Sequence, residues 1–466
     1  MSATLVCIDL GTTRLKVAAF TPEGELLQQV ATRHKETPDG QDPMRWWRDA
    51  VAAIRSLQIN NAAGLSLSGR GGAGVFLDRD GDVLAGPWAD DRHATELRRL
   101  YAWRSERFLP NYGAALVAKY LWLREHHAGL ARRCRYALYG KDYLLFRLTG
   151  AHVTDWSSGP DGPCWDPHLF EDFGLEPDLL PRPALPWEIA GNLTSTAARE
   201  TGLPEGIPVA VGAHDGICAN VGAGAGRPGD YAITLGTNAV TRAVTSTVPP
   251  GAYRFYALPP DRHVIGGNAL LGGRSLDWLL DILDGPDRGA HAYGTTDAEA
   301  AAVAPGADGA VFLPFLAGQV APEVRHGARG AFAGLRAEHG RDTLLRAVFE
   351  GTAFAVADIF EQVREWCGPP ASVRLTGGGA DSRLMRRFLA DVLNVTVEVS
   401  DSAVEARGAA VFLAVALGLY ADHDAAADAM VPVTGRVAPE LEGVETCRRL
   451  QARWRAVRDA MRTVEA

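Results

Sequence analysis

Two stretches of this chain share one hydrophobic pattern: an apolar run, a short polar turn and a second apolar run. Residues 5–10 and 15–20 flank a first turn with Thr12 and Thr13, and residues 231–235 and 239–244 flank a second turn with Gly236-Thr237. Such runs around a Gly-containing turn predict β-hairpins. Backbone N–H groups and hydroxyls at a tip of this kind converge on one spot, which suits phosphate oxygens. Two tips predict two halves that close on a nucleotide.

Segments of helical and strand period alternate in both halves of the chain. Residues 43–57 place Trp46, Trp47 and Ala50 on one helix face, and residues 342–366 form the longest stretch of helical period. Short apolar runs separate the helices. Alternating β and α units predict an α/β fold in which mixed sheets are flanked by helices.

The length of the chain predicts two large domains. At 466 residues it is too long for one compact core. Glycine recurs throughout residues 222–229, directly before the second hairpin, and this density suits a hinge. The sequence therefore predicts an N-terminal domain at residues 1–226 and a C-terminal domain at residues 227–466.

Charge and composition argue against several classes of protein. A net charge of −9 disfavours a broad nucleic-acid surface. No apolar run is long enough to span a bilayer, and no signal peptide is evident at the N-terminus. The six cysteines are scattered without a C-x-x-C pair, as expected for reduced thiols. We therefore expect a cytoplasmic protein without nucleic-acid or membrane partners.

The first hairpin tip carries candidate chemistry. Thr12 and Thr13 present hydroxyls, and Lys16 adds positive charge. Gly11, directly before the threonines, allows the backbone to approach a ligand closely. Asp9 would hold Mg²⁺ through water, because magnesium prefers a few oxygen ligands and keeps part of its hydration. An ordinary turn with a capping aspartate is the structural alternative. The matching second tip favours the phosphate-binding interpretation.

Asp215 follows a predicted strand and stands beside a predicted helix N-terminus. Open α/β sheets bind ligands at this position. In phosphoryl transfer to an alcohol, a carboxylate orients the hydroxyl and accepts its proton. Aspartate is also a frequent helix N-cap. The residues alone leave both roles open for Asp215.

Two glycine-rich segments lie near predicted strands. Residues 377–379 are three glycines between a strand and a helix, where a flat ring can lie against the backbone and the helix N-terminus favours anions. A tight strand-to-helix connection is the alternative, but it rarely needs three glycines. Residues 69–74 fit G-x-G-x-x-G, yet residues 75–81 read as a strand and a turn, so we expect no dinucleotide site there.

Taken in order, these motifs resemble the FGGY family of carbohydrate kinases over nearly the whole chain. The hairpin tips and the glycine run match the family's phosphate and adenosine motifs. The family's W-x-D-x-R, K-Y-x-W-L and K-D-Y-L to L-T-G segments are matched at residues 88–92, 119–123 and 141–150. The family signature is matched at residues 328–351, and the helix behind the adenosine motif is matched at residues 405–410.

The resemblance implies two actin-like (ribonuclease H-like) domains with ATP and Mg²⁺ in an interdomain cleft. It implies that Asp215 is the general base that accepts the proton of a hydroxyl on a small sugar or sugar acid. A homodimer is also among the expectations. The implied site residues are Thr12, Thr13, Lys16, Gly236 and Thr237 at the phosphates, Gly378, Gly379 and Ser382 at the nucleoside, Asp9 at the metal, and Trp88 and Asp90 in the sugar pocket.

Residues 211–243 resemble gluconokinases of the family, and xylulokinases tend to carry Asp-Asn where this chain has Asp-Gly at the base. Both groups usually have Met-His where this chain has Arg70-Gly71. Arg70 would pair bidentately with a sugar-acid carboxylate. A salt bridge from Arg70 to Asp90 or Asp91 is the alternative. We expect gluconate as acceptor, with xylulose or another ketose or polyol as the alternative.

Two other classes of protein are weighed against a sugar kinase. A non-catalytic actin-like ATP-binding protein would explain the hairpins, but not Asp215 or the segment 88–92, and it would release no ADP in response to a sugar. A nicotinamide oxidoreductase would require a helix after Gly74.

Overall fold

The computed structural model describes residues 3–35, 40–88, 90–103, 112–158, 165, 167–252, 254–258, 261–270, 272–285, 293–401 and 403–465. The chain divides into two compact units. Unit 1 consists of Met1–Gly226, Phe255–Asp261 and Ala403–Val431, and unit 2 consists of Arg227–Arg254, Arg262–Ser402 and Pro432–Ala466. The first segment of unit 1 ends at residue 226, and two later segments return to it.

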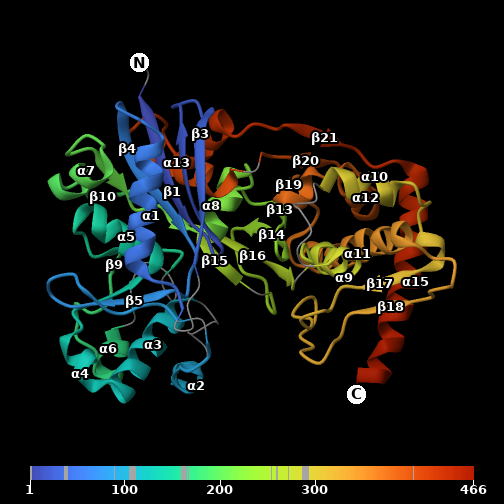
Figure 1. The fold of residues 1–466 in the computed structure, drawn as a ribbon, viewed down its shortest axis with the longest axis horizontal. Helices are drawn as coiled ribbons and strands as arrows, with labels where there is room; N and C mark the ends of the chain where they lie inside the picture. Colours follow the sequence, from blue (N-terminus) through green and yellow to red (C-terminus); the bar gives the residue numbers. More distant parts are fainter. Residues whose placement is uncertain are drawn as a thin grey trace. The chain divides into compact units, whose positions relative to one another are not determined.

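The first predicted hairpin lies at the centre of the unit 1 sheet (Figure 1). β1 (Thr4–Leu10) and β2 (Arg14–Phe20) pair antiparallel with Leu10 opposite Leu15, and β4 (Ala62–Gly69) pairs parallel to β1 on its other side. The sheet order is β10-β11-β4-β1-β2-β3, with β12 beside β4. The remaining strands of this sheet are β3 (Leu26–Arg33), β10 (Ile189–Asn192), β11 (Pro208–Ala210) and β12 (Ala213–His214).

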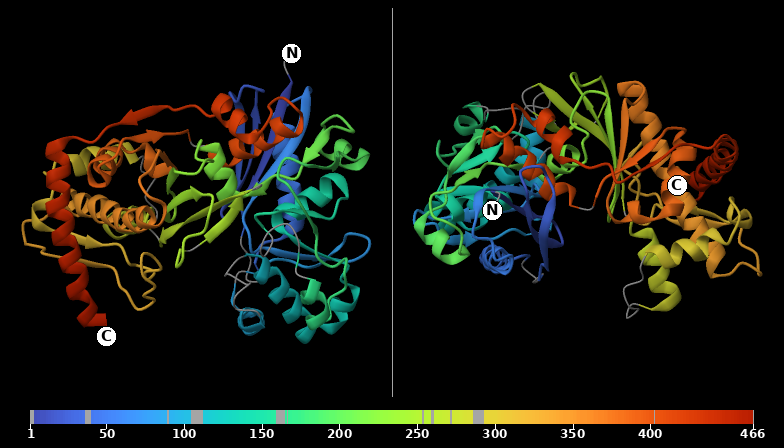
Figure 2. Two further views of the ribbon diagram at one scale, coloured as in Figure 1. Left: turned by 180° about the vertical axis from the view of Figure 1, so that it is seen from behind. Right: turned by 90° about the horizontal axis from the view of Figure 1, so that it is seen from above.

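Helices cover both faces of this sheet, so every residue of β1 is buried. On one face, α1 (Pro43–Ser56) packs Trp46, Trp47 and Ala50 into the core that also holds Val6 and Ile8. Asp42 caps α1, and Pro43 at its first position has no N–H to leave unpaired. On the other face lie α13 (Val404–Ala416) and α8 (Asp215–Gly222), which Figure 2 shows from two further sides.

A smaller layer of unit 1 has its own apolar core. It contains the sheet β6-β5-β7 and the helices α2 (Ala94–Trp103), α3 (Tyr112–His126) and α4 (Ala128–Arg133). The G-x-G-x-x-G segment leads into β5 (Gly74–Leu77), a strand, so the predicted absence of a dinucleotide fingerprint is confirmed. The other elements of unit 1 are β6 (Val83–Ala85), β7 (Tyr136–Tyr139), α5 (Gly140–Thr149), β8 (Val153–Asp155), α6 (Pro167–Phe173), β9 (Arg182–Ala184), α7 (Ser195–Thr201) and α14 (His423–Met430).

Unit 2 repeats the plan around the second predicted hairpin. β13 (Asp230–Leu235) and β14 (Ala239–Thr245) pair antiparallel with Leu235 opposite Ala239. The strands run in the order β16-β14-β13-β19-β20-β21. The long helix α11 (Arg341–Cys367) packs on them and is almost entirely buried between Thr343 and Phe360.

The remaining strands of this sheet are β16 (Arg262–Ala269), β19 (Ser372–Thr376), β20 (Val397–Val399) and β21 (Gly435–Val437). The other elements of unit 2 are α9 (Ser275–Asp284), α10 (Tyr293–Ala301), α12 (Arg383–Leu393), α15 (Leu441–Glu465) and the two-stranded sheet of β17 (Val311–Leu313) and β18 (Ala331–Ala333). Most of β15 (Arg254–Leu258) counts with unit 1.

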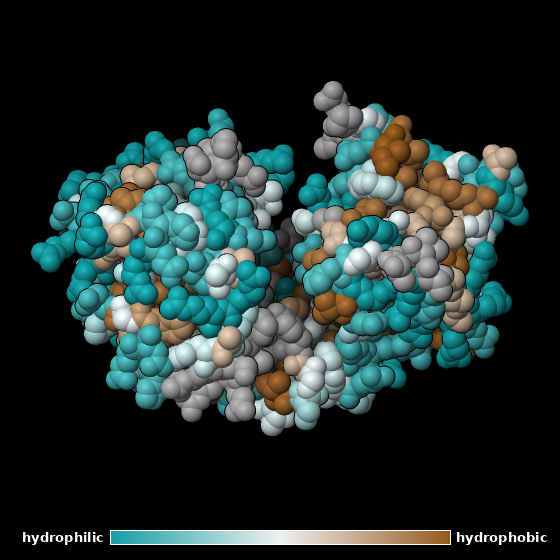
Figure 3. Space-filling model, turned by 90° about the horizontal axis from the view of Figure 1, so that it is seen from below, coloured by the Kyte–Doolittle hydropathy of each residue, from teal (hydrophilic) through white to brown (hydrophobic). Residues whose placement is uncertain are grey.

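Large exposed apolar side chains are spread over different elements, among them Leu27, Ile282, Val324 and Leu441. Hydrophilic side chains cover most of the face drawn in Figure 3. None of the helices in the described ranges is both long and apolar enough to cross a membrane. Five cysteines are free thiols, and Cys164 lies outside the described residues.

Candidate active site

The first hairpin brings a buried carboxylate and an amine together. Asp9 and Lys16 lie opposite each other in the β1–β2 register, with Lys16 Nζ 3.5 Å from Asp9 Oδ2. Ser68 on β4 donates a hydrogen bond to Asp9 Oδ1 at 2.9 Å. Lys16 Nζ also lies 3.3 Å from Glu405 Oε2, which α13 supplies from the far end of the sequence. Lys16 therefore links the hairpin to α13.

Negative charge exceeds positive charge around Asp9. Burial and the nearby Glu405 carboxylate raise the pKa of Asp9 to about 7, and Asp215 adds to the effect, against the lowering by Lys16 and by the hydrogen bond from Ser68. Carboxylates that repel one another in a desolvated place favour a bound cation. This environment fits the metal role predicted for Asp9.

The tip of the first hairpin is anchored through its carbonyl groups, while its hydroxyls face solvent. His34 Nε2 lies 3.0 Å from the carbonyl oxygen of Gly11, and Gln41 Nε2 donates to the carbonyl of Thr12 at 3.1 Å. Thr12 and Thr13 are exposed. A fixed backbone with exposed hydroxyls is a suitable cradle for phosphate oxygens.

Asp215 is the first residue of α8, and the N-cap of that helix is His214. The alternative that Asp215 serves as the N-cap is therefore wrong. His214 Nδ1 lies 2.9 Å from Asp215 Oδ1, and the Asp215 side chain is 29% exposed while His214 is buried. A partly exposed carboxylate with a buried imidazole behind it is a suitable arrangement for a general base.

The loop at residues 69–72 connects three parts of unit 1. The backbone N–H of Arg70 donates to the carbonyl of Leu10 at the end of β1, at 3.1 Å. The backbone N–H of Gly71 donates to His214 Nε2 at 3.0 Å, and the carbonyl of Gly72 accepts from Lys119 Nζ at 2.7 Å. The structure thus ties the first hairpin, the His214–Asp215 pair and the predicted sugar pocket to one short loop.

The W-x-D-x-R segment forms a cluster of aromatic rings and cations. Arg92 binds both carboxylate oxygens of Asp90, and this hydrogen bonding lowers the pKa of Asp90 to about 2. The Arg92 guanidinium also lies 5.4 Å from the ring of Trp88 and 5.3 Å from that of Trp122. The indole Nε1 of Trp88 is buried and makes no hydrogen bond within the described part of the chain. Ala89 of this segment lies outside the described residues.

In unit 2, the tip of the second hairpin is held by close backbone contacts. The N–H of Gly236 donates to the carbonyl of Asn238 at 3.0 Å, and the N–H of Arg274 donates to the carbonyl of Thr237 at 3.2 Å. A Cβ on Gly273 would lie 1.5 Å from the carbonyl oxygen of Gly236, so only glycine fits there. The Thr237 side chain is exposed, which suits the phosphate contact predicted for it.

The predicted nucleoside residues lie beside the second hairpin in the same unit. Gly378 and Gly379 open the turn η2 (Gly378–Asp381), and a Cβ on Gly379 would lie 2.7 Å from Cβ of Leu235. The Ser382 hydroxyl caps α12 by accepting from Met385 N and donates to Asp297 at 2.6 Å. Ser382 therefore carries structural hydrogen bonds that its prediction as a nucleoside contact did not include.

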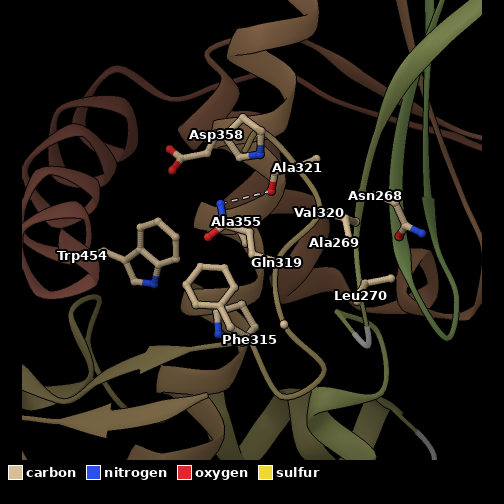
Figure 4. A pocket seen from close by; sticks show the side chains of 13 residues that line it. Asn268, Ala269, Leu270, Phe315, Gln319, Val320, Ala321, Ala355, Asp358 and Trp454 are labelled. Atoms are coloured by element: carbon tan, nitrogen blue, oxygen red, sulfur yellow. Dashed lines mark hydrogen bonds between the residues drawn. The ribbon is translucent and has the colours of Figure 1, made fainter. Parts of the chain in front are cut away.

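The described residues of unit 2 enclose two small cavities besides a larger one of about 480 Å³, which is lined by none of the predicted site residues. One, of about 30 Å³, is lined by ten residues that include Gly273, Gly379 and Ser382 and the apolar side chains Leu276 and Phe349. The other, of about 10 Å³, lies among Phe315, Gln319, Ala355 and Trp454, where Gln319 Nε2 donates to the carbonyl of Ala321 at 3.3 Å (Figure 4). The second has room for about one water molecule and contains none of the predicted site residues.

The residues present fit ATP and Mg²⁺ in different ways. Asp9 supplies a carboxylate in an electronegative place, and the exposed threonines of both tips suit phosphates. Within the described ranges, no group of three or more His, Cys, Asp or Glu side chains is arranged to hold a metal ion. Mg²⁺ does not require such a group, because it keeps several waters and shares phosphate oxygens.

The predicted site residues fall into two groups, one in each unit. Asp9, Thr12, Thr13, Lys16, Arg70, Trp88, Asp90 and Asp215 lie in unit 1, and Gly236, Thr237, Gly378, Gly379 and Ser382 lie in unit 2. Sequence reasoning missed the contacts made by Glu405 and His214. Glu405 is 389 positions from Lys16 and His214 is 143 positions from Gly71, so no local spacing signals these pairs.

Comparison with known proteins decides the family. Residues 4–222 match the N-terminal domain and residues 231–417 the C-terminal domain of the FGGY family of carbohydrate kinases. The chain belongs to the FGGY family of carbohydrate kinases. It is thus a carbohydrate kinase with an α/β fold of two actin-like domains, and kinases of this family use ATP, generally with Mg²⁺.

Relatives of this FGGY kinase are named after two different substrates. It is 32% identical to a xylulose kinase of Streptomyces rubiginosus, over 87% of this chain and 84% of the relative. It is 26% identical to a gluconokinase of Bacillus licheniformis, over 97% of this chain and 94% of the relative. The crystal structure of xylulose kinase from Rhodospirillum rubrum matches with a TM-score of 0.83 and 28% identity, over 99% of both chains. Identity alone therefore does not choose the acceptor.

Proposed function

We propose that this FGGY kinase phosphorylates a hydroxyl of a sugar acid, with gluconate as the preferred acceptor, ATP as donor and Asp215 as general base. The observation that carries the choice of a sugar acid is a pair of cations in unit 1. Lys119 and Arg70 are close enough for the charge of Arg70 to lower the pKa of Lys119, and Lys119 is only 5% exposed.

The contacts of this pair support recognition of an anion. Lys119 Nζ donates to the carbonyls of Gly72 and Trp88, which are neutral, so these two hydrogen bonds supply no counter-charge. Arg70 Nη2 donates to the amide oxygen of Gln41 at 3.3 Å. The Asp90 carboxylate, one of the two alternative partners of Arg70, is bound by Arg92. A carboxylate ligand would offset two neighbouring positive charges.

The chain's own residues then divide the work of phosphoryl transfer. Asp215 accepts the proton of the acceptor hydroxyl at a carboxylate oxygen, and the loop at residues 69–72 sets the acceptor beside it. Lys16, Thr12, Thr13, Gly236 and Thr237 would hold the phosphates of ATP, Asp9 would hold Mg²⁺ through water, and Gly378, Gly379 and Ser382 would lie at the nucleoside. Bound ATP supplies the phosphoryl group, and Mg²⁺ offsets its charge.

Xylulose is the second candidate acceptor. It is favoured by the identity of the chain to relatives named xylulose kinase, which is similar to its identity to a gluconokinase. A ketopentose carries no charge, however, and would gain no electrostatic attraction from the positive charges of Arg70 and Lys119.

An ATP-coupled assay over gluconate, other aldonates, ketopentoses and polyols tests both parts of the proposal. We expect gluconate or another aldonate to give the highest kcat/KM. Asp215→Asn should lower kcat at least about a hundredfold, because it removes the proton acceptor, while ATP binding measured by calorimetry persists. Arg70→Gln should raise the KM for gluconate about ten- to a hundredfold, because a charge-assisted hydrogen bond is lost.

Neutral acceptors are the internal control for Arg70→Gln, since their KM should change little. Activity confined to ketopentoses or polyols would reject the sugar-acid assignment and leave the kinase assignment intact. Full activity of Asp215→Asn would reject Asp215 as the base.

A further inference from the structure

Contacts at both ring nitrogens and on one ring face hold the His214 ring in place. It ends β12, caps α8 and is only 2% exposed. Nδ1 lies 2.9 Å from Asp215 Oδ1 and 3.0 Å from the backbone N of Gly216, and Nε2 lies 3.0 Å from the backbone N of Gly71. The ring of Tyr256 packs on the imidazole with 4.4 Å between centroids. The ring cannot turn without losing several of these contacts.

The pattern of donors around the ring selects one tautomer. A backbone N–H is always a donor, so the N–H of Gly71 requires Nε2 to be an acceptor. The proton of the neutral ring then sits on Nδ1, where it can donate to the Asp215 carboxylate, and only the N–H of Gly216 is mismatched. The opposite tautomer carries the proton on Nε2 and leaves Nδ1 free to accept from the N–H of Gly216. It also sets the Nε2–H against the N–H of Gly71 and the Nδ1 lone pair against the Asp215 carboxylate. One mismatch is favoured over two.

We propose that His214 is a positioning residue for the general base, donating its Nδ1–H to Asp215 Oδ1 so that the carboxylate is held with Oδ2 directed to the acceptor hydroxyl. This inference rests on the proposed role of Asp215. It follows the general requirement that a base be oriented by a third group whose own partners are fixed. Here the third group is the imidazole, and Gly71 fixes its protonation.

The backbone at His214 is fixed by a buried polar network. Its N–H lies 3.3 Å from Asp155 Oδ2 and 3.1 Å from Ser157 Oγ. Lys141 Nζ holds Asp155 Oδ1 at 3.0 Å and Asp142 Oδ1 at 2.6 Å, and all three side chains are almost fully buried. Buried polar groups that are hydrogen-bonded to one another in this way have few alternative arrangements. Both the backbone and the ring of His214 are therefore preorganised.

Two substitutions separate positioning from packing. His214→Asn keeps an amide N–H near the place of Nδ1, whereas His214→Gln puts its amide near the place of Nε2 and leaves Asp215 without its donor. We expect His214→Gln to lower kcat about ten- to a hundredfold, the usual cost of losing an orienting partner, with the acceptor KM within about twofold of the unsubstituted enzyme. His214→Asn should keep kcat within about threefold.

A matched control and a double variant complete the experiment. His423 in unit 1 is also a buried histidine, stacked on Trp187 at 5.3 Å and 3.7 Å from the carboxylate of the adjacent Asp424, so His423→Gln should leave kcat unchanged. Adding His214→Gln to Asp215→Asn should lower kcat no further, because the two residues act as a unit.

Each other outcome has a defined meaning. Equal loss of kcat in the Asn and Gln variants, or a rise in KM alone, would overturn the positioning role. Full activity of His214→Gln would overturn it as well. If Asp215→Asn is active, the proposed base fails first, and this result is separate from any effect of His214.

Discussion

The side-chain ammonium group of Lys119 is buried near the Arg70 guanidinium. Its two hydrogen bonds to backbone carbonyls satisfy donors without supplying a counter-charge. Burial and then the charge of Arg70 lower the pKa of Lys119 from 10.5 to about 8, Arg92 acts in the same sense, and Asp90 and Asp91 partly oppose them. The charge of this lysine therefore changes within an experimentally accessible pH range.

This shift predicts a pH dependence that is specific to anionic acceptors. Lys119 is protonated below about pH 8 and loses its positive charge above it, so attraction for a substrate carboxylate weakens as the pH rises. We expect the KM for gluconate to rise between about pH 7.5 and 9.5, measured in steady state at constant ionic strength. A neutral ketose or polyol is the comparison, and its KM should not follow the same curve. Identical profiles for both acceptors would contradict the role of Lys119.

At the scale of elements, the crossing of α8 and α13 decides where Asp215 and Glu405 stand. The helices meet at two glycines: a Cβ on Gly408 would lie 2.0 Å from the carbonyl oxygen of Cys218, and one on Gly222 would lie 1.9 Å from that of Val404. Backbones can approach this closely only where no side chain intervenes. Asp215 begins one helix and Glu405 lies in the first turn of the other.

Gly408→Ala is expected to destabilise the protein and lower kcat. The added methyl meets backbone, which cannot rotate away, so α13 must shift, at a cost of about 1–3 kcal/mol. Chemical denaturation measures the free energy of unfolding, and the coupled assay measures kcat. Gly129→Ala in α4 is the control, because a Cβ there meets nothing within 4 Å. Equal stability of the two variants would show that the crossing can relax.

The last helix, α15, illustrates an element that hydrophobic periodicity did not predict. It lies beyond residue 417, where the match to the family's C-terminal domain ends. Trp454 donates its indole N–H to the carbonyl of Phe312 at 2.8 Å, and Arg455 donates to Asp358 of α11 at 2.6 and 2.8 Å. Because polar contacts with α11 help to hold α15, its apolar pattern alone is a weak signal.

At the scale of the whole molecule, the units are not consecutive stretches of chain. Residues 403–431 belong to unit 1, and α13 covers β1 and β4 with side chains that include Val411 and Phe412, which are fully buried. The sheet of unit 1 therefore depends on a helix that follows nearly all of unit 2 in the sequence.

A fragment of residues 1–226 should for this reason fail to fold cooperatively. Without α13, one face of β1 and β4 exposes apolar side chains to water. We expect the isolated fragment to bind the dye ANS and to show no sharp thermal transition by circular dichroism, unlike the full chain. A sharp transition without dye binding would show that the predicted domain 1–226 is stable by itself.

Local patterns were sufficient for the hairpins and for most helices. The register of β1 with β2 follows from a four-residue tip, and that of β13 with β14 from a three-residue one, because short turns leave few pairings. Helix α11 was predicted to within a residue at each end, since its apolar face repeats at helical period.

The sequence by itself determined the family, the two hairpins, the acidic residue at 215 and the sugar-kinase chemistry, because each depends on residue types at short, fixed spacings. Only the tertiary structure decided that Glu405 pairs with Lys16, that the backbone N–H of Gly71 donates to His214 Nε2, and that residues 403–431 return to unit 1. These contacts join residues more than a hundred positions apart, and packing of backbone and helices, not any local pattern, brings them together.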